Sequence, residues 1–403
     1  MAPPTTRARD RGAHAASSAG VLSLDTLFLV LLCLPAKEIC RLRVICRSWR
    51  SLTFDPLFVK EHAARHPGPL LLAKFRDDEE HVHVVDLLSG NVVVKRLAGA
   101  GDHHQLLCTN LDLACLVTKC NSCRVLSPAT GAIYTLPKYP ALGDPNRADI
   151  YKPATAFAFG RAPSTGEYKV LRMFNRRHLH GEHRRQLFDV CTINGGTSNN
   201  AQWRAQSRDI FVDAGSAVAV GGAVYFLMHG TYYPFKRPDA VLTRNPPDHI
   251  ASFDIEREEW RRGLRGPISG SLDMDNHDDR NEYSGLRHQL TLAELKGSLV
   301  IANCSHFRSI MDIWFLTDFE NGLWVKEYSI KTELIKGRLT FDYCVKPLLV
   351  LDDGRLIIYV VLGATGQLLI CDPQANTSTE VEMGHLDSIG IYTGNLLSLQ
   401  RGW

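Results

Sequence analysis

Short apolar runs separated by turn-forming residues fill most of this chain, and several of them share an internal spacing. In four places a strand-like run ends at a small polar residue, and an apolar residue starts the next run six positions later. These pairs are Asp86 and Val92, Ser127 and Ile133, Asp254 and Trp260, and Asp318 and Trp324. A looser copy surrounds Asp372, and a copy with an inserted loop surrounds Asp189. The chain therefore contains about six copies of a strand-turn-strand unit, about 40 to 65 residues apart.

The remaining signals between residue 67 and the end are also those of β-structure. Runs such as "HVHVVDLLSGNVVVKRL", "GGAVYFLMHG", "GSLVIANCS" and "GRLIIYVVLG" are bounded by Gly, Asp and Asn, and long amphipathic helices are absent. Repeated four-stranded units at this period are typical of a β-propeller, whose closed ring protects the strand edges. A pair of packed sheets in a sandwich is the structural alternative.

The segment before residue 67 has a helical period instead. One apolar set recurs at steps of three and four residues: Leu24, Leu27, Phe28, Leu31 and Leu32. Pro35 should end this helix at Leu34, and a short second helix should run from Ala36 through Ile39 and Leu42. A third helix is expected to place one apolar set opposite Arg43, Arg47 and Arg50, and to end at Asp55-Pro56. That apolar set is Leu42, Ile45, Cys46, Trp49 and Leu52.

The apolar run Leu27–Leu34 also has the length of a signal-peptide core, although it is too short to span a membrane. Asp25 interrupts the run, which begins late in the chain, and no small-x-small cleavage site follows Pro35. Eleven cysteines, an odd number placed mostly in apolar runs, indicate free thiols in a reducing compartment. We therefore expect residues 1–20 to be a disordered leader, with a transit peptide as the alternative, and the protein to act in the cytoplasm, the nucleus or both.

The stretch "LSLDTLFLVLLCLPAKEICRLRVICRSWRSLTFDPLF" resembles the F-box, the trihelical motif that binds a Skp-type adaptor in SCF ubiquitin ligases. The matching positions are Leu22, Asp25, Leu27, Val30, Leu31, Leu34, Pro35, Lys37, Leu42, Arg43, Ile45, Cys46, Trp49, Arg50, Leu52, Asp55 and Pro56. The chain departs from the family at Ser23, where proline is usual, and at Leu29 and Cys33, where a charged residue is common. These departures predict weaker adaptor binding rather than loss of the fold.

A second resemblance covers roughly residues 100 to 390. The segments "FGRAPSTGEYKVLRMF", "HIASFDIEREEW" and "MDIWFLTDFENGLWVKEYSI" resemble the F-box-associated domain of plant F-box proteins, a kelch-like propeller. The expected fold is thus multidomain, α plus all-β: a leader at 1–20, a trihelical F-box-like module at 21–66, and a β-propeller-like domain at 67–403.

Together the resemblances imply a substrate receptor of an SCF-type ubiquitin ligase. Such a chain catalyses no reaction and needs no cofactor. It binds a Skp-type adaptor, through it a cullin, and an unknown target protein. The resemblance implies that the adaptor contact is formed or supported by ten residues. These are Leu22, Leu27, Leu31, Leu34, Pro35, Ile39, Leu42, Ile45, Cys46 and Trp49. An adaptor-independent propeller scaffold and an exported propeller enzyme are the alternatives.

Other chemistry has weak support in the sequence. No nucleotide-binding or hydrolase motif is present, and the net charge of +3 does not indicate nucleic acid or membrane as a partner. Cys120-x-x-Cys123 with Cys108, Cys115 and His103-His104 lacks a second pair at zinc-finger spacing, so we predict a hairpin there and no metal site. Leu272–Glu282 resembles a calcium loop only faintly and should be an acidic surface loop. The basic stretch Lys169–Arg185 should be a solvated hairpin loop, or in a minority interpretation a recognition loop for an acidic partner.

Overall fold

The structure is a computed structural model, and it divides into two compact units, residues 1–67 and 68–403, which are described separately. The residues it describes are 23–66, 68–87, 90–98, 104–107, 112–118, 122–137, 155–176, 185–193, 201–206, 208, 210–229, 231–232, 243–244, 246–268, 286, 289–305, 309–332, 343–362, 365–394 and 397. The predicted leader 1–20 lies outside them, as does Leu22.

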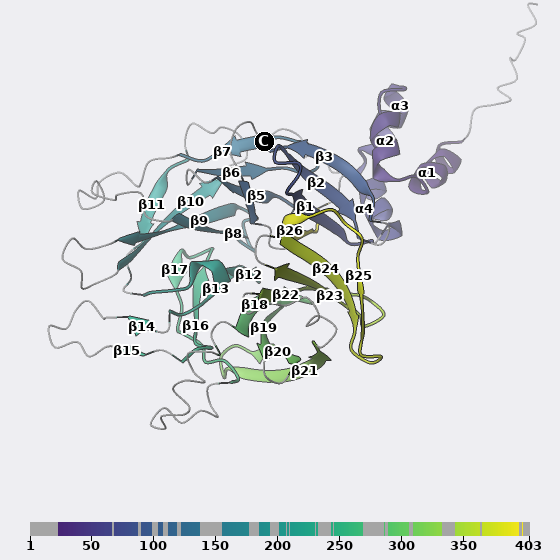
Figure 1. Cartoon of the computed structure of the whole chain (residues 1–403). Helices are drawn as coiled ribbons and strands as arrows, with labels where there is room; N and C mark the ends of the chain where they lie inside the picture. Colours follow the sequence, from purple (N-terminus) through teal and green to yellow (C-terminus); the bar gives the residue numbers. More distant parts are fainter. Residues whose placement is uncertain are drawn as a thin grey trace, which may run out of the picture. The chain divides into compact units, whose positions relative to one another are not determined.

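Four helices form the described part of the first unit, which we call the helical module (Figure 1). They are α1 (Leu24–Leu32), α2 (Ala36–Leu42), α3 (Arg47–Thr53) and α4 (Pro56–Arg65). The Oγ of Ser23 accepts a hydrogen bond from the Thr26 N–H at 3.2 Å and so caps α1. Pro35 separates α1 from α2, as the sequence predicts, although α1 ends at Leu32, two residues before the predicted end at Leu34.

Two details of the predicted module are wrong. The third helix begins at Arg47 and not near Leu42, because Cys46 is extended and occupies the N-cap position. Asp55-Pro56 ends this helix but also starts another, since the Asp55 Oδ1 accepts the Leu57 N–H at 2.7 Å and Pro56 fits the first turn of α4. The trihelical segment is therefore followed by a fourth helix.

The helix α4 completes the core of the module. The Phe58 ring is fully buried and meets the Phe28 ring edge-on, with 5.2 Å between centroids. At the end of α1, the Nε2 atoms of His62 and His66 lie 2.8 and 2.9 Å from the Leu34 and Leu32 carbonyl oxygens. His62 of α4 and His66, which directly follows α4, thus partner carbonyls of the kind that a helix leaves unpaired at its C-terminus.

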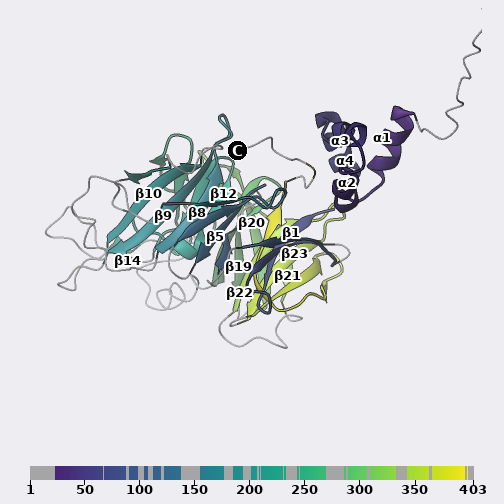
Figure 2. The same cartoon turned by 90° about the horizontal axis from the view of Figure 1, so that it is seen from above.

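The second unit consists of six four-stranded antiparallel units, counted over its described residues, which we call blades (Figure 1). The last and the first of these blades are joined into one eight-stranded sheet through the Gly366↔Leu386 pair. Blade 2 contains β4 (His104–Leu107), β5 (Ala114–Thr118), β6 (Cys123–Leu126) and β7 (Ile133–Thr135). Blade 3 contains β8 (Thr155–Arg161), β9 (Tyr168–Arg176), β10 (Arg185–Ile193) and β11 (Trp203–Gln206). Figure 2 shows β8, β9 and β10 side by side, as their pairing requires.

The next three blades follow in chain order. Blade 4 contains β12 (Val218–Val220), β13 (Ala223–Leu227), β16 (Ile250–Asp254) and β17 (Glu259–Trp260), with the small ribbon β14 (Thr231–Tyr232) and β15 (Thr243–Arg244) between β13 and β16. Blade 5 contains β18 (Leu290–Leu295), β19 (Ser298–Ser305), β20 (Ile310–Asp318) and β21 (Leu323–Lys331). Blade 6 contains β22 (Tyr343–Val350), β23 (Leu356–Leu362), β24 (Thr365–Asp372) and β25 (Thr377–Glu380).

Blade 1 joins the two ends of this unit. Its first strand is β26 (Leu386–Tyr392), and β1 (Leu70–Phe75), β2 (His81–Asp86) and β3 (Val92–Leu97) follow. The pairing of β26 with β1 runs from Leu70↔Tyr392 to Phe75↔Leu386. A strand from the end of the chain therefore closes the ring that a strand from its start begins.

The blades form a ring rather than a sandwich. Their first strands contact one another in the cyclic order β4, β8, β12, β18, β22, β26 and back to β4. Apolar clusters fill the space between neighbouring blades, for example Phe188 of blade 3 with Phe226 of blade 4, and Met311 of blade 5 with Ile358 of blade 6. The propeller prediction is thus confirmed, and the sandwich alternative is wrong.

The six-residue spacing corresponds to the turn between the third and fourth strands of a blade. Asp86, Asp254, Asp318 and Asp372 each end a third strand, and Ser127 directly follows one. Asp189 differs because β10 continues to Ile193, so Asp189 lies within the strand, opposite Arg172 of β9. Its carboxylate is fully buried and accepts a hydrogen bond from the Arg172 guanidinium at 3.0 Å.

Candidate functional sites

The outward face of α1 is apolar. Leu27, Leu31 and Leu32 point into the module, whereas Leu29 is 57% exposed and Val30 47% exposed. Thr26 and Cys33 continue the exposed face, since positions 26, 29, 30 and 33 share one side of a helix. An unpartnered apolar helix face of this kind is typical of a docking surface. Leu29 and Cys33, the two departures from the F-box pattern, both lie on it.

A second exposed apolar group lies outside α1. Val44 and Ile45, in the turn between α2 and α3, are 87% and 59% exposed, and Leu57 at the start of α4 is 60% exposed. The large apolar side chains that the module leaves exposed are therefore Leu24, Leu29, Val30, Val44, Ile45 and Leu57. Only Ile45 of these six is among the ten predicted adaptor-contact residues, because apolar period and family match do not indicate which side chains are exposed.

The structure divides the ten predicted adaptor-contact residues into groups. Leu27, Leu31 and Ile39 are buried in the module, and Leu34, Leu42 and Trp49 are half-buried. Pro35, Ile45 and Cys46 are exposed, and Leu22 lies outside the described residues. The first group can support a contact surface through the module's fold, and the exposed group can contribute to it directly.

The helical period predicts that Arg43, Arg47 and Arg50 all lie on the exposed side, and this prediction is wrong for Arg43. Arg47 and Arg50 are exposed, but Arg43 is buried, with its guanidinium donating to the Thr53 carbonyl oxygen at 2.7 Å and to the Thr53 Oγ1 at 3.2 Å. The Arg43 guanidinium carbon also lies 4.0 Å from the centroid of the Phe54 ring. Arg43 therefore ties α2 to the end of α3, and burial lowers its pKa.

The propeller contains the cysteine hairpin that the sequence predicts. The hairpin expected around Cys123 is confirmed as β5–β6, although Cys108, Cys120 and His103 lie outside the described residues. The Sγ atoms of Cys115 and Cys123 are 3.1 Å apart, and burial raises the pKa of the Cys123 thiol, which opposes the thiolate form that zinc requires. Within the described ranges, no group of three or more metal-ligating side chains occurs. The acidic stretch Leu272–Glu282 lies outside these ranges.

The expectation of a solvated basic loop at Lys169–Arg185 is wrong for its first part. Lys169 and Arg172 are buried on β9, where each has an acidic partner. The Lys169 Nζ is 2.8 Å from the Glu258 carboxylate, which also accepts the Arg204 guanidinium and so joins blades 3 and 4. The centre of the stretch, residues 177–184, lies outside the described residues.

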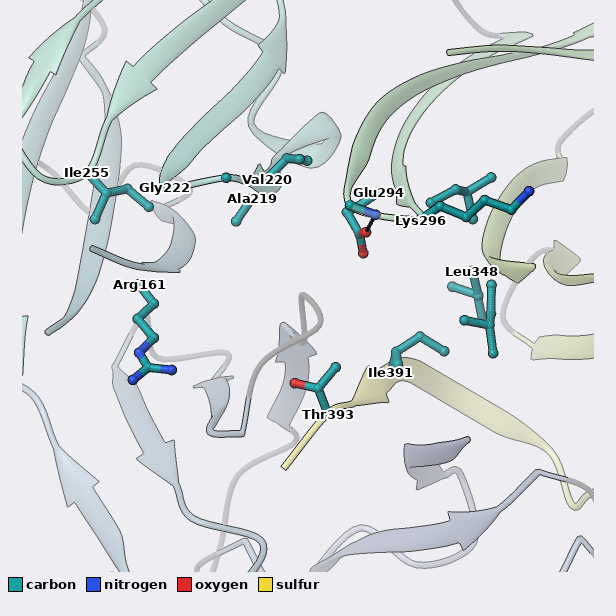
Figure 3. Close-up of a pocket in the computed structure, with 14 residues that line it drawn as sticks. Arg161, Ala219, Val220, Gly222, Ile255, Glu294, Lys296, Leu348, Ile391 and Thr393 are labelled. Carbon is teal, nitrogen blue, oxygen red and sulfur yellow. Dashed lines mark hydrogen bonds between the residues drawn. The ribbon is translucent and has the colours of Figure 1, made fainter. Parts of the chain in front are cut away.

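A cavity of about 440 Å³ lies within the propeller, at the end of the ring where the first strands of the blades terminate (Figure 3). Its walls come from five blades, through Arg161, Val220, Glu294, Leu348 and Ile391 among others. Seven of the fourteen lining residues are aliphatic and three are glycine. No sequence pattern predicts the cavity, because its residues are distant in sequence.

Glu294 is the half-buried charged side chain of this cavity. In Figure 3 its carboxylate points into the cavity, whereas the Lys296 side chain extends away from it. The Gly297 N–H donates to the Glu294 Oε1 at 2.6 Å and orients the carboxylate, while burial raises its pKa. The Lys296 Nζ is hydrogen-bonded to the Tyr328 hydroxyl at 3.1 Å.

No helix among the described residues is long and apolar enough to cross a membrane. Residues 24–63 match the family described as F-box-like, and residues 103–392 match the F-box associated beta propeller domain. F-box protein At3g07870 from Arabidopsis thaliana is 25% identical over 84% of this chain and 79% of its own length. F-box protein At5g18160 from the same plant is 23% identical over 94% of this chain and 86% of its own length.

Among solved structures, TolB from Acinetobacter baumannii is similar at 12% identity with a TM-score of 0.41, over 86% of this chain and 73% of that one. The propeller family covers well over half of the sequence, and the F-box-like match coincides with the helical module. The chain therefore belongs to the family of proteins with an F-box associated β-propeller domain, and an F-box-like module precedes that domain in the sequence.

Proposed function

We propose that this chain is the substrate-recognition subunit of an SCF-type E3 ubiquitin ligase. The helical module binds a Skp-type adaptor, and through it a cullin, while the propeller binds a target protein. The exposed apolar face of α1, together with Val44 and Ile45, supports this proposal most directly. An apolar face exposed to water is stabilised when a protein partner covers it, and the module that carries this face matches the F-box-like family.

Such a receptor contributes binding and orientation rather than bond chemistry. Holding a target beside a ubiquitin-charged enzyme raises the effective concentration of the reacting groups. The family membership favours a substrate adaptor over a catalytic subunit. The relevant surfaces are then two, one on the module for the adaptor and one on the propeller for the target.

Co-expression of the full chain with a Skp-type adaptor tests the first surface. We expect Val30→Asp and Ile45→Asp each to reduce copurification strongly, because a charge would be buried without a partner at the contact. Leu323→Asp is the matched control, since Leu323 is 56% exposed but lies on β21 of the propeller. The double variant Leu34→Ala/Pro35→Ala tests the connection between α1 and α2.

Two outcomes contradict the proposal. One is that both aspartate variants copurify with the adaptor as well as the wild type and the Leu323→Asp control do. The other is that the wild type copurifies with no Skp-type adaptor, which would favour an adaptor-independent propeller scaffold. Circular dichroism of each variant separates loss of docking from loss of the helical module.

A further inference from the structure

The cavity at the end of the propeller ring has the properties of a specific binding site. Its volume of about 440 Å³ falls within the range of roughly 300–1,000 Å³ of ligand pockets in proteins. Two tight turns frame it, Gly221-Gly222 between β12 and β13 and Lys296-Gly297 between β18 and β19. All four turn residues have positive φ, including Lys296 at 52°, which is unusual for a residue with a side chain. The Lys296-Gly297 turn places the Gly297 N–H where it holds the Glu294 carboxylate.

The charges around the cavity are not equivalent. The Lys296 ammonium is hydrogen-bonded to Tyr328 and lies 5.7 Å from the centroid of that ring. Arg161 is exposed, its Nε donates to the Gly166 carbonyl oxygen at 3.1 Å, and its guanidinium carbon is 5.5 Å from the Tyr168 ring centroid. Glu294 differs from both: within the described part of the chain its Oε2 has no hydrogen-bond partner, and its carboxylate is directed into the cavity (Figure 3).

This asymmetry favours a cationic occupant. An ion pair gains most where water is partly excluded, and little at an exposed side chain such as Arg161. The aliphatic lining by Val220, Leu348 and Ile391 would suit the methylene stem of a long side chain, while Glu294 would meet its charged end. Lysine and arginine side chains combine these two parts.

We propose that this cavity binds a lysine or arginine side chain of the target protein, with Glu294 as the residue that recognises its charge. This inference rests on the proposed function, in which the propeller binds the target. The target would then bind at the end of the ring that contains the C-terminal ends of the first strands. The segment of the target that binds there would be basic.

The test uses the full chain with labelled isoleucine, leucine and valine methyl groups, so that Ile255, Leu348 and Ile391 report on the cavity by NMR. The probes are acetyl-Ala-Arg-Ala-amide, its lysine analogue and its citrulline analogue, in which a neutral urea replaces the guanidinium at nearly the same size. We expect the two basic peptides to shift these methyl signals saturably, and the citrulline peptide to bind roughly tenfold more weakly. Glu294→Gln should remove the preference, and Arg161→Gln should leave it intact.

A second measurement does not depend on any variant folding. Acidification from about pH 7.5 to about pH 5 should weaken binding of the arginine peptide, because the carboxylate begins to protonate while the guanidinium stays charged. The citrulline peptide should show a smaller change. A pH-independent preference for arginine would contradict the assignment of Glu294.

Three results overturn the inference. The first is equal binding of the arginine and citrulline peptides. The second is tighter binding of acetyl-Ala-Glu-Ala-amide that is lost in Arg161→Gln. The third is the absence of any methyl shift at about 10 mM peptide, a concentration well above the dissociation constant expected for a specific contact. Adaptor copurification is measured on the same Glu294→Gln sample and should equal that of the wild type. Failure of the peptides with intact adaptor binding refutes this inference alone, whereas failure of adaptor binding refutes the proposed function.

Discussion

The buried pair of Arg172 and Asp189 gives the sharpest stability prediction for the propeller. The two residues face each other on β9 and β10, with 3.0 Å between the Arg172 Nη2 and the Asp189 Oδ2. Their side chains are 3% and 0% exposed. The Arg172 guanidinium carbon also lies 3.9 Å from the Trp203 ring centroid and 4.6 Å from that of Phe174. Removing the aspartate would take this buried counter-charge away from a cation that lies among aromatic rings.

We expect Asp189→Ala to destabilise the propeller by about 3–5 kcal/mol, the usual cost of breaking a buried ion pair on one side. Replacing both partners, as in Arg172→Met/Asp189→Leu, should recover most of this loss, because the buried cation is removed together with its counter-charge. The control is Asp353→Ala. Asp353 pairs with Arg355 at 2.7 Å, but the two side chains are 51% and 42% exposed, so we expect a loss below about 1 kcal/mol.

Urea unfolding followed by tryptophan fluorescence measures these changes as shifts of the midpoint at constant slope. Asp189→Asn serves as a milder variant if Asp189→Ala does not fold. The reasoning is refuted if Asp189→Ala costs no more than Asp353→Ala. It is also refuted if the double variant is less stable than Asp189→Ala, since the loss would then come from the removed side chains rather than from the missing counter-charge.

Two further predictions concern local packing and pH. A Cβ at position 366 would lie 2.1 Å from the Tyr359 hydroxyl oxygen and 2.2–2.3 Å from two atoms of its ring, so Gly366→Ala should destabilise blade 6 by about 1–3 kcal/mol in the same urea assay. Gly68→Ala, whose Cβ would lie 3.5 Å from the Asp86 carboxylate, should be nearly neutral. Burial lowers the pKa of His62 below its usual value of 6.5, so the unfolded chain takes up the proton first and the module loses stability as pH falls through about 6.5. Hydrogen-exchange protection of α1 and α4 should therefore decrease between about pH 7.5 and about pH 5.5 in the wild type, and much less in His62→Gln.

The blades could be predicted from the sequence because each is a local object. A hairpin's strands and turn are close in the chain, so its alternating apolar residues and its turn residues are neighbours in the sequence, as at Asp318 and Leu323. The closing pair of β1 and β26 could not be predicted in this way. Its partners are some three hundred residues apart, and their pairing depends on the whole ring. The cavity has the same origin, since five blades each contribute only a few residues to it.

The errors near Asp189 and Asp55 have a different cause. The same polar residue types occur where a helix or strand begins and where one ends, so the residue type alone does not indicate which of the two occurs. Asp55-Pro56 breaks α3, but an aspartate followed by proline is equally the start of a helix, as α4 shows. The basic stretch around Arg172 predicts a solvated loop, and the repeat predicts that Asp189 ends a strand. Only their cross-strand register reveals that the two charges meet and can be buried together.

The helix α1 shows most clearly what a sequence pattern leaves open in this chain. It is apolar almost all round, so its periodicity does not indicate which side is covered, and α4 decides this by packing Phe58 against Phe28. Truncating Leu31 or Ile39 would then abolish adaptor binding for either of two reasons, lost docking or lost folding, because both are buried. Leu29 and Ile45 are exposed, and their substitution changes the surface while the core stays filled. If Leu29→Lys, which restores a charge common at this position in F-boxes, increases adaptor binding, the predicted weakening by Leu29 is correct. If it decreases binding, the apolar face of α1 is itself part of the contact.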